Sequence, residues 1–266
     1  MNYFINLSRM RAGYAMACVC AALLLPVTEN ASARTLDEVK SQGAIVMCAS
    51  PNALPYASEK PETPGFQIEI GRAIAEGLGV GFNIDWIVAR RRRHLVNCDM
   101  LFDSVNDPEV NKGRARLSRP YQKSGIVLGL NRDAEDIRDF AQLKQGQKIG
   151  VMIGSVAQLV LGQAEKTTSP YAFESDMMED LQKGELYGVA GSAMILSYYM
   201  FQHPDLGLRL VNAFDGEPGL TWEVAVGLRR SDAALVDAVN EILERLIADG
   251  TLTRIYAKYG VEHRLP

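Results

Sequence analysis

Acidic side chains at a regular spacing are the first candidates for chemistry in this chain. Asp99, Asp103 and Asp107 recur every four residues. The first two fall on or beside an expected strand, and no glycine and glutamate complete the pattern of a calcium-binding loop. Asp103 would be a carboxylate in a cleft, as a dehydratase needs, but no second acid is evident to share general acid–base work. We therefore expect neither a calcium site nor a catalytic acid pair.

Motifs of other enzymes and metal centres are also missing from the sequence. The histidines are far apart along the chain, at His94, His203 and His263. There is no HExxH, C-x-x-C or G-x-S-x-G motif. The sequence thus predicts a protein that is not an enzyme and that binds no metal and no cofactor.

Neutral polar residues near the ends of expected strands are our candidates for a ligand site. Ligands of α/β sheets bind beyond the carboxyl ends of the strands, which directs attention to the loops at 50–56 and 104–106. Ser155 and Ser192 each precede an expected helix; Ser155 either only caps its helix or lies among free amides that bind an anionic group. The candidate ligand residues are Ser50, Asn52, Tyr56, Ser104, Asn106, Asn111, Ser155 and Ser192.

One dense charge cluster is present, formed by Arg90, Arg91, Arg92 and Arg93. At the carboxyl end of a strand it would lie on the rim of a cleft and hold an anionic ligand or dock an acidic protein. The other interpretation is an ordinary solvated surface run. With a net charge of −4 and no basic stripe, the chain is not expected to bind nucleic acid.

The first 33 residues have the pattern of a secretory signal peptide. Arg9 and Arg11 precede an apolar run at 14–25 that is too short to cross a bilayer. Small residues at 31–33 predict cleavage between Ala33 and Arg34, and hence a periplasmic protein with no remaining membrane span.

Two of the four cysteines lie in this leader, so Cys48 and Cys98 remain. In an oxidising compartment such a pair predicts a disulfide. Cys48 lies late in its expected strand, whereas Cys98 precedes its own. With this offset the two Cα atoms can be too far apart for a disulfide, so two buried thiols are the alternative.

Strands and helices are expected to alternate along the rest of the chain. Apolar runs predict strands at 45–48, 82–87, 100–105, 126–130 and 148–153. Apolar residues at helical spacing predict a helix that opens at Gly65-Phe66 and stops at Gly79. They also predict a helix after Ser155 with Val156, Leu159 and Val160 on one face. In the last long helix the core-facing stripe is expected at Val236, Val239, Leu243, Leu246 and Ile247. Such alternation indicates an α/β protein built from parallel βαβ units.

Two segments carry a family resemblance: AIVMCASPNALPYASEKPETPGFQIEIGRAIAEGLG, at residues 44–79, and the C-terminal residues 224–261. Both resemble the type II periplasmic solute-binding proteins, solute-binding protein family 3. The resemblance implies two α/β lobes joined by a two-stranded hinge that closes on a small molecule. It predicts lobe one at 34–123, lobe two at 124–221 and a return to lobe one at 222–266.

Amino-acid-binding members of this family hold their ligand with an arginine and aspartates. By resemblance these positions correspond here to Asn111, Ser50 and Ser192, and a family threonine corresponds to Val156. A zwitterionic amino acid is therefore not the expected ligand, since both its charges would be desolvated without partners.

The runs CASPNALPY and SRPYQKS are most similar to the MxaJ/XoxJ-type binding protein of quinoprotein methanol-dehydrogenase systems. This resemblance implies a non-catalytic accessory of a PQQ-dependent alcohol dehydrogenase, with the dehydrogenase and/or a cytochrome c as its partner. The alternative is a substrate-binding protein of an ABC transporter, which works with a permease and binds a small polar or anionic solute.

Overall fold

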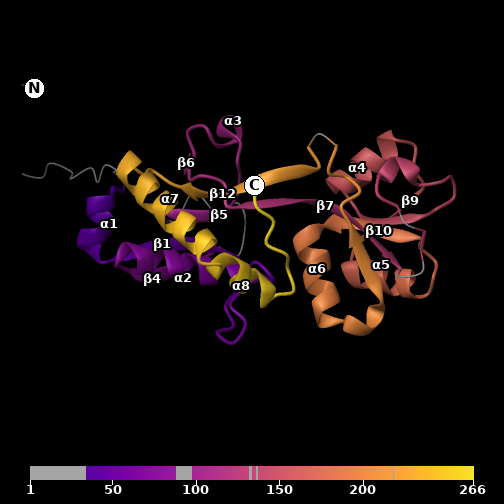
Figure 1. The fold of residues 1–266 in the computed structure, drawn as a ribbon, viewed down its shortest axis with the longest axis horizontal. Coiled ribbons are helices and arrows are strands. Elements are labelled where there is room, and N and C mark those ends of the chain that lie inside the picture. The colour runs from indigo at the N-terminus through magenta and orange to yellow at the C-terminus, as the bar shows by residue number, and fades with distance from the viewer. Residues whose placement is uncertain (1–33, 88–97, 132–133, 136, 218) are drawn as a thin grey trace, which may run out of the picture. The chain divides into compact units, whose positions relative to one another are not determined.

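One mixed ten-stranded sheet organises the protein. The computed structural model describes residues 34–87, 98–131, 134–135, 137–217 and 219–266. Its strands follow the order β4-β1-β5-β12-β7-β10-β8-β9, with β6 beside β12 and β11 beside β7. Helices cover the sheet on either side of the crossing strands β7 and β12 (Figure 1). The predicted α/β class is confirmed.

Lobe one is the part of the sheet around β1 together with its helices. Strand β1 pairs in parallel with β4 and β5, as βαβ units require. Its strands are β1 (Ala44–Ala49), β4 (Gly81–Trp86), β5 (Met100–Val105) and β6 (Arg116–Leu117), with a hairpin of β2 (Asn52–Ala53) and β3 (Ala57–Ser58). Its helices are α1 (Leu36–Gln42), α2 (Phe66–Leu78), α3 (Pro108–Asn111), α7 (Ala233–Ala248) and α8 (Thr251–Ala257).

Lobe two is the part of the sheet around β10. Strand β8 pairs in parallel with β10 and β9. Its strands are β8 (Ile149–Met152), β9 (Thr168–Tyr171), β10 (Gly188–Ser192) and β11 (Leu208–Val211). Its helices are α4 (Val156–Gln163), α5 (Glu174–Gln182) and α6 (Ala193–Gln202), and short 3-10 turns occupy Phe140–Gln142 and Pro204–Leu206.

Two long strands connect the lobes, as the resemblance implies. Strands β7 (Gln122–Asn131) and β12 (Thr221–Leu228) pair antiparallel through Gln122–Gly125 and Thr221–Val224. Beyond this crossing, β12 pairs with β5 and β7 pairs with β10 and β11. The exact lobe boundaries at 123/124 and 221/222 stay a prediction.

Helix α2 ends where its sequence predicts. Gly79 ends α2 in the left-handed conformation, with φ 73°, and its N–H bonds the carbonyls of Ala75 and Glu76. The predicted apolar face is buried at Ile70, Ile74 and Leu78, which join the core of lobe one. Helix α7 is also as predicted, since Val239 and Leu243 are buried in the same core.

The predicted inner face of α4 is wrong. Val156 and Leu159 are 50% and 59% exposed, whereas Ala157 and Leu161 are buried. The buried residues of α4 thus lie one position later along the helix than we expected. Only Val160 of the predicted face packs against the core of lobe two.

The C-terminal segment reaches from lobe one to lobe two. After α8, the carbonyl of Arg264 accepts a hydrogen bond from the Lys123 N–H at 2.8 Å. The Arg264 guanidinium bonds Asn212 Oδ1 at 2.9 Å and forms an ion pair with Asp215 at 2.8 Å. Figure 1 shows this segment running from α8 toward β12. It is a third connection between the two lobes.

Candidate functional site

A cavity of about 480 Å³ lies where the carboxyl ends of β1 and β5 meet the crossing strands. This volume falls within the range of about 300–1,000 Å³ that is usual for small-molecule pockets. Its walls come from β1 and the following loop, α2, β5, β7, β12, α6 and α8. The lining residues are Cys48, Ala49, Ser50, Ala53, Tyr56, Ala57, Phe66, Gln67, Ile87, Leu101, Phe102, Ser104, Val105, Tyr121, Gln122, Ser124, Met194, Trp222, Val224 and Tyr256.

Aromatic rings form much of the cavity wall. Phe66, the first residue of α2, lies with its ring centroid 5.1 Å from that of Tyr56 and 4.7 Å from that of Tyr256. The rings of Phe102 and Tyr121 meet edge to face at 6.3 Å. Such pairs contribute about 0.5–1.5 kcal/mol beyond their area burial. The wall is therefore firmly packed before any ligand enters.

The tyrosine hydroxyls of this wall stay protonated. Desolvation by burial raises the pKa of Tyr56, although its hydrogen bond with Ser192 opposes the shift. Burial raises the pKa of Tyr256 well above its usual value, and the neighbouring Tyr121 adds to the effect. Both hydroxyls are therefore neutral groups.

The crossing strands supply the polar part of the wall. Gln122 is 1% exposed, and its Nε2 donates to the Lys123 carbonyl at 2.8 Å and to the Glu262 carbonyl at 3.4 Å. Its Oε1 is buried and has no hydrogen-bond partner among the described residues. A buried acceptor left in this state costs about 1–3 kcal/mol.

No charged residue is found among the described residues that line the cavity. The strand pleat explains part of this, because alternate residues of β7 and β12 point to opposite faces. Gln122, Ser124, Trp222 and Val224 line the cavity, while the intervening pair, Lys123 and Glu223, lies opposite each other in register. The described lining of the pocket is thus neutral and mixes polar with apolar residues.

Three of the predicted ligand residues line the cavity: Ser50, Tyr56 and Ser104. A fourth, Ser192, lies next to it, with its Oγ 3.3 Å from the Tyr56 hydroxyl. Ser192 precedes α6 as predicted, but its side chain makes no capping bond to the helix. The hydrogen bond instead joins lobe two to lobe one.

The other predicted ligand residues take part in local structure. Asn52 is exposed in β2, and Asn106 Nδ2 donates to Glu223 at 2.8 Å. Asn111 Nδ2 donates to the carbonyls of Val105 and Asp107, and Ser155 caps α4 by accepting from the Gln158 N–H. None of these four residues is among those that line the cavity. Their part in ligand binding stays a prediction.

The predicted arginine cluster, Arg90 to Arg93, lies outside the described residues, as does the predicted leader at 1–33. The described helices contain none long and apolar enough to cross a membrane. The described residues also contain no group of three or more histidine, cysteine, aspartate or glutamate side chains that could hold a metal ion.

Several cavity residues were not recognised in the sequence, namely Gln67, Tyr121, Gln122, Met194, Trp222 and Tyr256. Our candidates came from loops after strands, whereas five of these residues lie within strands and helices and Tyr121 directly precedes β7. Gln122 and Ser124 are polar residues beside an apolar β-run, and this pattern could have indicated that both are buried polar residues of the site.

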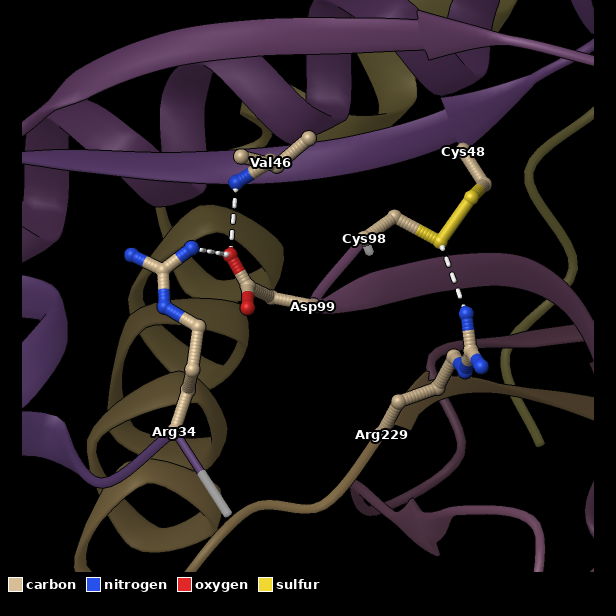
Figure 2. Close-up of a disulfide and its surroundings, with 6 residues drawn as sticks. All are labelled: Arg34, Val46, Cys48, Cys98, Asp99 and Arg229. Atoms are coloured by element: carbon tan, nitrogen blue, oxygen red, sulfur yellow. Dashed lines mark hydrogen bonds and ion pairs between the residues drawn. A yellow bond between two sulfur atoms is a disulfide. The ribbon is translucent and has the colours of Figure 1, made fainter. Parts of the chain in front are cut away.

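Cys48 and Cys98 form a disulfide at the edge of this site, with their Cα atoms 5.4 Å apart (Figure 2). This separation is within the usual range of about 4.4–6.8 Å for a disulfide. The offset of the two cysteines in their strands, which left two buried thiols as the alternative, therefore does not prevent the bond. Arg229 Nη1 lies 3.5 Å from Cys98 Sγ. The disulfide links the end of β1 to the start of β5.

A buried ion pair lies beside the disulfide. Asp99 Oδ2 accepts from Arg34 Nη1 and from the Val46 N–H, each at 2.8 Å (Figure 2). Desolvation by burial raises the pKa of Asp99, although these bonds and the charges of Arg34 and Arg229 oppose the shift. This cluster fixes the N-terminal end of the described chain to lobe one.

The fold is that of a two-lobed α/β protein with a cavity at the carboxyl ends of strands β1 and β5. Residues 45–262 match the family described as bacterial extracellular solute-binding proteins, family 3. This match spans most of the chain, so the protein belongs to that family.

Individual relatives are distant. The chain is 24% identical over 265 residues to a protein named "Probable histidine-binding protein" from Neisseria gonorrhoeae, covering 94% of this chain and 96% of that one. It is also 24% identical over 250 residues to membrane-bound lytic murein transglycosylase F of Yersinia pestis, with 86% of this chain covered. In that case it spans only 48% of the relative's length.

Solved structures share the fold. The L-cystine solute receptor of Neisseria gonorrhoeae, unliganded and open, matches with a TM-score of 0.73 at 17% identity, covering 86% of this chain and 97% of that one. The ancestral cationic amino acid solute-binding protein AncCDT-1 matches with a TM-score of 0.70 at 20% identity, covering 84% and 98%. At these identities the likeness concerns the fold alone.

Proposed function

We propose that this protein binds a small solute in the cavity without catalysing a reaction. The observation that carries the proposal is the neutral, aromatic lining to which both lobes contribute, Tyr56 and Phe66 from lobe one and Met194 from lobe two. General acid–base chemistry needs a group poised to move a proton. The lining offers tyrosines held protonated and no carboxylate or imidazole among its described residues.

We propose further that the solute is not a standard amino acid. By resemblance, the charged anchors of amino-acid-binding family members correspond here to Asn111, Ser50 and Ser192, and Asn111 is bonded to its own loop. Neutral amides and hydroxyls do not offset the desolvation of a carboxylate and an ammonium group together.

The biological role that we propose first is that of a periplasmic accessory to a PQQ-dependent alcohol dehydrogenase. Its support is the resemblance of residues 48–56 to the loop of MxaJ/XoxJ-type proteins. In this structure that loop lines the cavity through Cys48, Ala49, Ser50, Ala53 and Tyr56. The partner would be the dehydrogenase, its cytochrome c, or both.

The second role is that of a substrate-binding protein for an ABC permease. It is supported by the full-length relative named as a probable histidine-binding protein and by the formed cavity. The Arg90–Arg93 run would then serve an anionic solute at the rim, as the sequence suggests.

The export of the protein is a further proposal. We infer cleavage between Ala33 and Arg34. The family is described as extracellular, which agrees with export, and Arg34 is part of the fold through its ion pair with Asp99. Cleavage after Arg34 would leave that buried carboxylate without this partner.

Calorimetry tests the central proposal. We expect glutamate, arginine, histidine and glutamine to bind no tighter than about 1 mM. Micromolar affinity for any of them would contradict it and would favour the importer role. Titration with the purified quinoprotein dehydrogenase of the same cell, and separately with the permease in lipid nanodiscs, distinguishes the two roles.

A further inference from the structure

The carboxyl ends of the strands of lobe two form an edge that borders the cavity. Ser192 ends β10 and is bonded to Tyr56 of lobe one, and Met194, two residues later, lines the cavity. Strand β8 runs parallel to β10 and to β9, so the residues that follow β8 and β9 lie at the same edge. The N–H of Ile153, just after β8, donates to the carbonyl of Tyr171, which ends β9, at 2.9 Å.

This edge carries accessible apolar side chains. Ile153 is 63% exposed, and Phe173, two residues after β9, is 66% exposed. Val156, the first residue of α4, is exposed as well. Exposed apolar side chains that gather at one place on a soluble protein are typical of binding surfaces. The edge can therefore cover an apolar group of a ligand.

The same edge carries a half-buried acid, Glu174, which is the first residue of α5. Each of the other three acids of α5 has a hydrogen-bond or ion-pair partner: Ser175 for Asp176, Lys183 for Glu179, and Tyr171 for Asp180. Glu174 has no such partner in the part of the chain that the structure describes, and desolvation by burial raises its pKa. An opposite charge placed beside this carboxylate would stabilise its ionised form.

The charge of Glu174 acts on the wall of the cavity. It raises the pKa of Tyr56, although Tyr56 belongs to lobe one. The hydroxyls of Tyr56 and Ser192 are bonded to each other and keep further lone pairs that can accept from a ligand N–H. A cationic group near Glu174 would thus find both an opposite charge and neutral acceptors.

The groups at this edge that could serve an anion are bonded within their own loop. Free N–H groups at a helix N-terminus attract negative charge. At the start of α4, however, the Gly154 N–H donates to Gln158 Oε1 at 2.7 Å and the Ser155 N–H donates to the Met152 carbonyl at 3.1 Å. The Ser155 hydroxyl accepts from the Gln158 N–H. The edge therefore favours a cation over an anion.

We infer that the edge of lobe two binds an organic amine, whose ammonium group meets Glu174 and whose apolar substituent lies against Ile153 and Phe173. The inference rests on the proposed solute-binding function and names the chemical class of the solute. By resemblance, the ammonium-binding acids of amino-acid-binding relatives correspond to Ser50 and Ser192, so Glu174 holds the cation from a different position. The amine carries no carboxylate, because the position of the family arginine is Asn111.

A series built on one phenylethyl group tests the charge and the apolar part separately. 2-Phenylethylamine is cationic, 2-phenylethanol is neutral, 3-phenylpropanoate is anionic, phenylalanine is zwitterionic, and ethylamine has the charge without the ring. The protein is first unfolded in urea without reductant and refolded, which removes any solute carried through purification. Each compound is then titrated by calorimetry in 0.1 M salt, where charges more than about 10 Å apart are largely screened.

We expect 2-phenylethylamine to bind with a Kd below about 1 mM and each of the other four compounds to bind at least about tenfold more weakly. Glu174→Gln should weaken binding of the amine by about tenfold or more, since it removes the opposite charge. Asp176→Asn is the matched control, because it removes a charge from the same turn of α5, and it should leave the affinity unchanged. Melting temperatures check that both variants fold.

Phe173 tests the apolar contact. Phe173→Ser should weaken binding of 2-phenylethylamine by about threefold or more, whereas Phe173→Leu, which keeps an apolar side chain, should retain most of the affinity. Absence of amine binding, or equal losses in Glu174→Gln and Asp176→Asn, would overturn the inference.

The other compounds separate this inference from the proposed function. Tighter binding of 3-phenylpropanoate or 2-phenylethanol than of the amine would overturn the assignment to an amine and leave solute binding in place. Micromolar binding of phenylalanine would contradict both, because the proposed solute is not a standard amino acid.

Discussion

The hydroxyl of Tyr56 lies 3.3 Å from the Oγ of Ser192, and this hydrogen bond joins the β2–β3 hairpin of lobe one to the start of α6 in lobe two. Around it, Met194 enters the core of lobe one, and the rings of Tyr198 and Tyr259 lie 6.4 Å apart. Helix α6 is thus the part of lobe two that meets lobe one across the cavity, and Tyr56 is both a wall of the pocket and a contact between the lobes.

A double-mutant cycle measures this contact. We expect Tyr56→Phe and Ser192→Ala each to lower the free energy of unfolding, with a coupling of about 0.5–1.5 kcal/mol between them, as for a single hydrogen bond. Urea unfolding gives the four values. Tyr171→Phe is the matched control, because the Tyr171 hydroxyl bonds Asp180 within lobe two. Purely additive effects of the first two changes would show that the contact does not form in solution.

The disulfide should be complete in the exported protein. Thiol titration of the unfolded, unreduced protein should detect no free thiol after removal of the leader. Cys48 and Cys98 are 50 residues apart, so replacing both by serine should cost about 4 kcal/mol on a chain-entropy estimate. Two titratable thiols, or an unchanged stability in the double variant, would contradict the bridge.

Gly65 should tolerate no side chain. Its φ is +93°, and a Cβ would lie 2.6 Å from the Ala57 Cα. We expect Gly65→Ala to destabilise the protein by about 3 kcal/mol or more, because backbone strain and overlap both act. Gly162→Ala, in α4 with open space around it, should instead stabilise by about 0.5–1 kcal/mol. Thermal or urea unfolding compares the two, and equal effects would refute the difference.

Asp99 should give lobe one an unusual pH dependence. Burial raises its pKa in the folded state above the ordinary 3.8, so its contribution to stability is greatest below that value and declines as the pH rises through the raised pKa. Relative to Asp99→Asn, the natural protein should therefore lose stability between about pH 3 and about pH 7.

The exposed Asp249 provides the control of opposite sign. Its hydrogen bonds with Thr251 lower its pKa, so its contribution is present above 3.8 and is lost as the pH falls through the lowered pKa. Relative to Asp249→Asn, the natural protein should gain stability over the same interval. Urea titrations at both pH values measure both differences, and slopes of the same sign would contradict the assignment.

Elements with strong local signals could be predicted closely from the sequence. The strand at Met100–Val105 has the bounds we expected, and Gly79 ends α2 as its lack of a side chain suggests. The two-stranded connection between the lobes was also predicted, but from the family resemblance. For the strand and for α2, an apolar period or a glycine fixed the local backbone.

The composition of the site was harder to predict, because distant segments build it. Tyr256 on α8 meets Phe66 on α2 only after the chain has passed through lobe two. Strand β7 is buried on both faces from Ser124 to Leu130, so alternation gave no sign of which residues face the pocket. The buried face of α4 was predicted wrongly because two of its apolar residues, Val156 and Leu159, lie on the surface.

The contacts of Arg264 change how the lobes can move. A pair of neighbouring strands permits both bending and twisting of one lobe against the other. The C-terminal segment adds an attachment outside that pair, because Arg264 is bonded to Lys123 on β7 and to Asp215 in lobe two. A third attachment should restrict how one lobe rotates against the other, so a ligand bound between the lobes would lose less conformational entropy on binding.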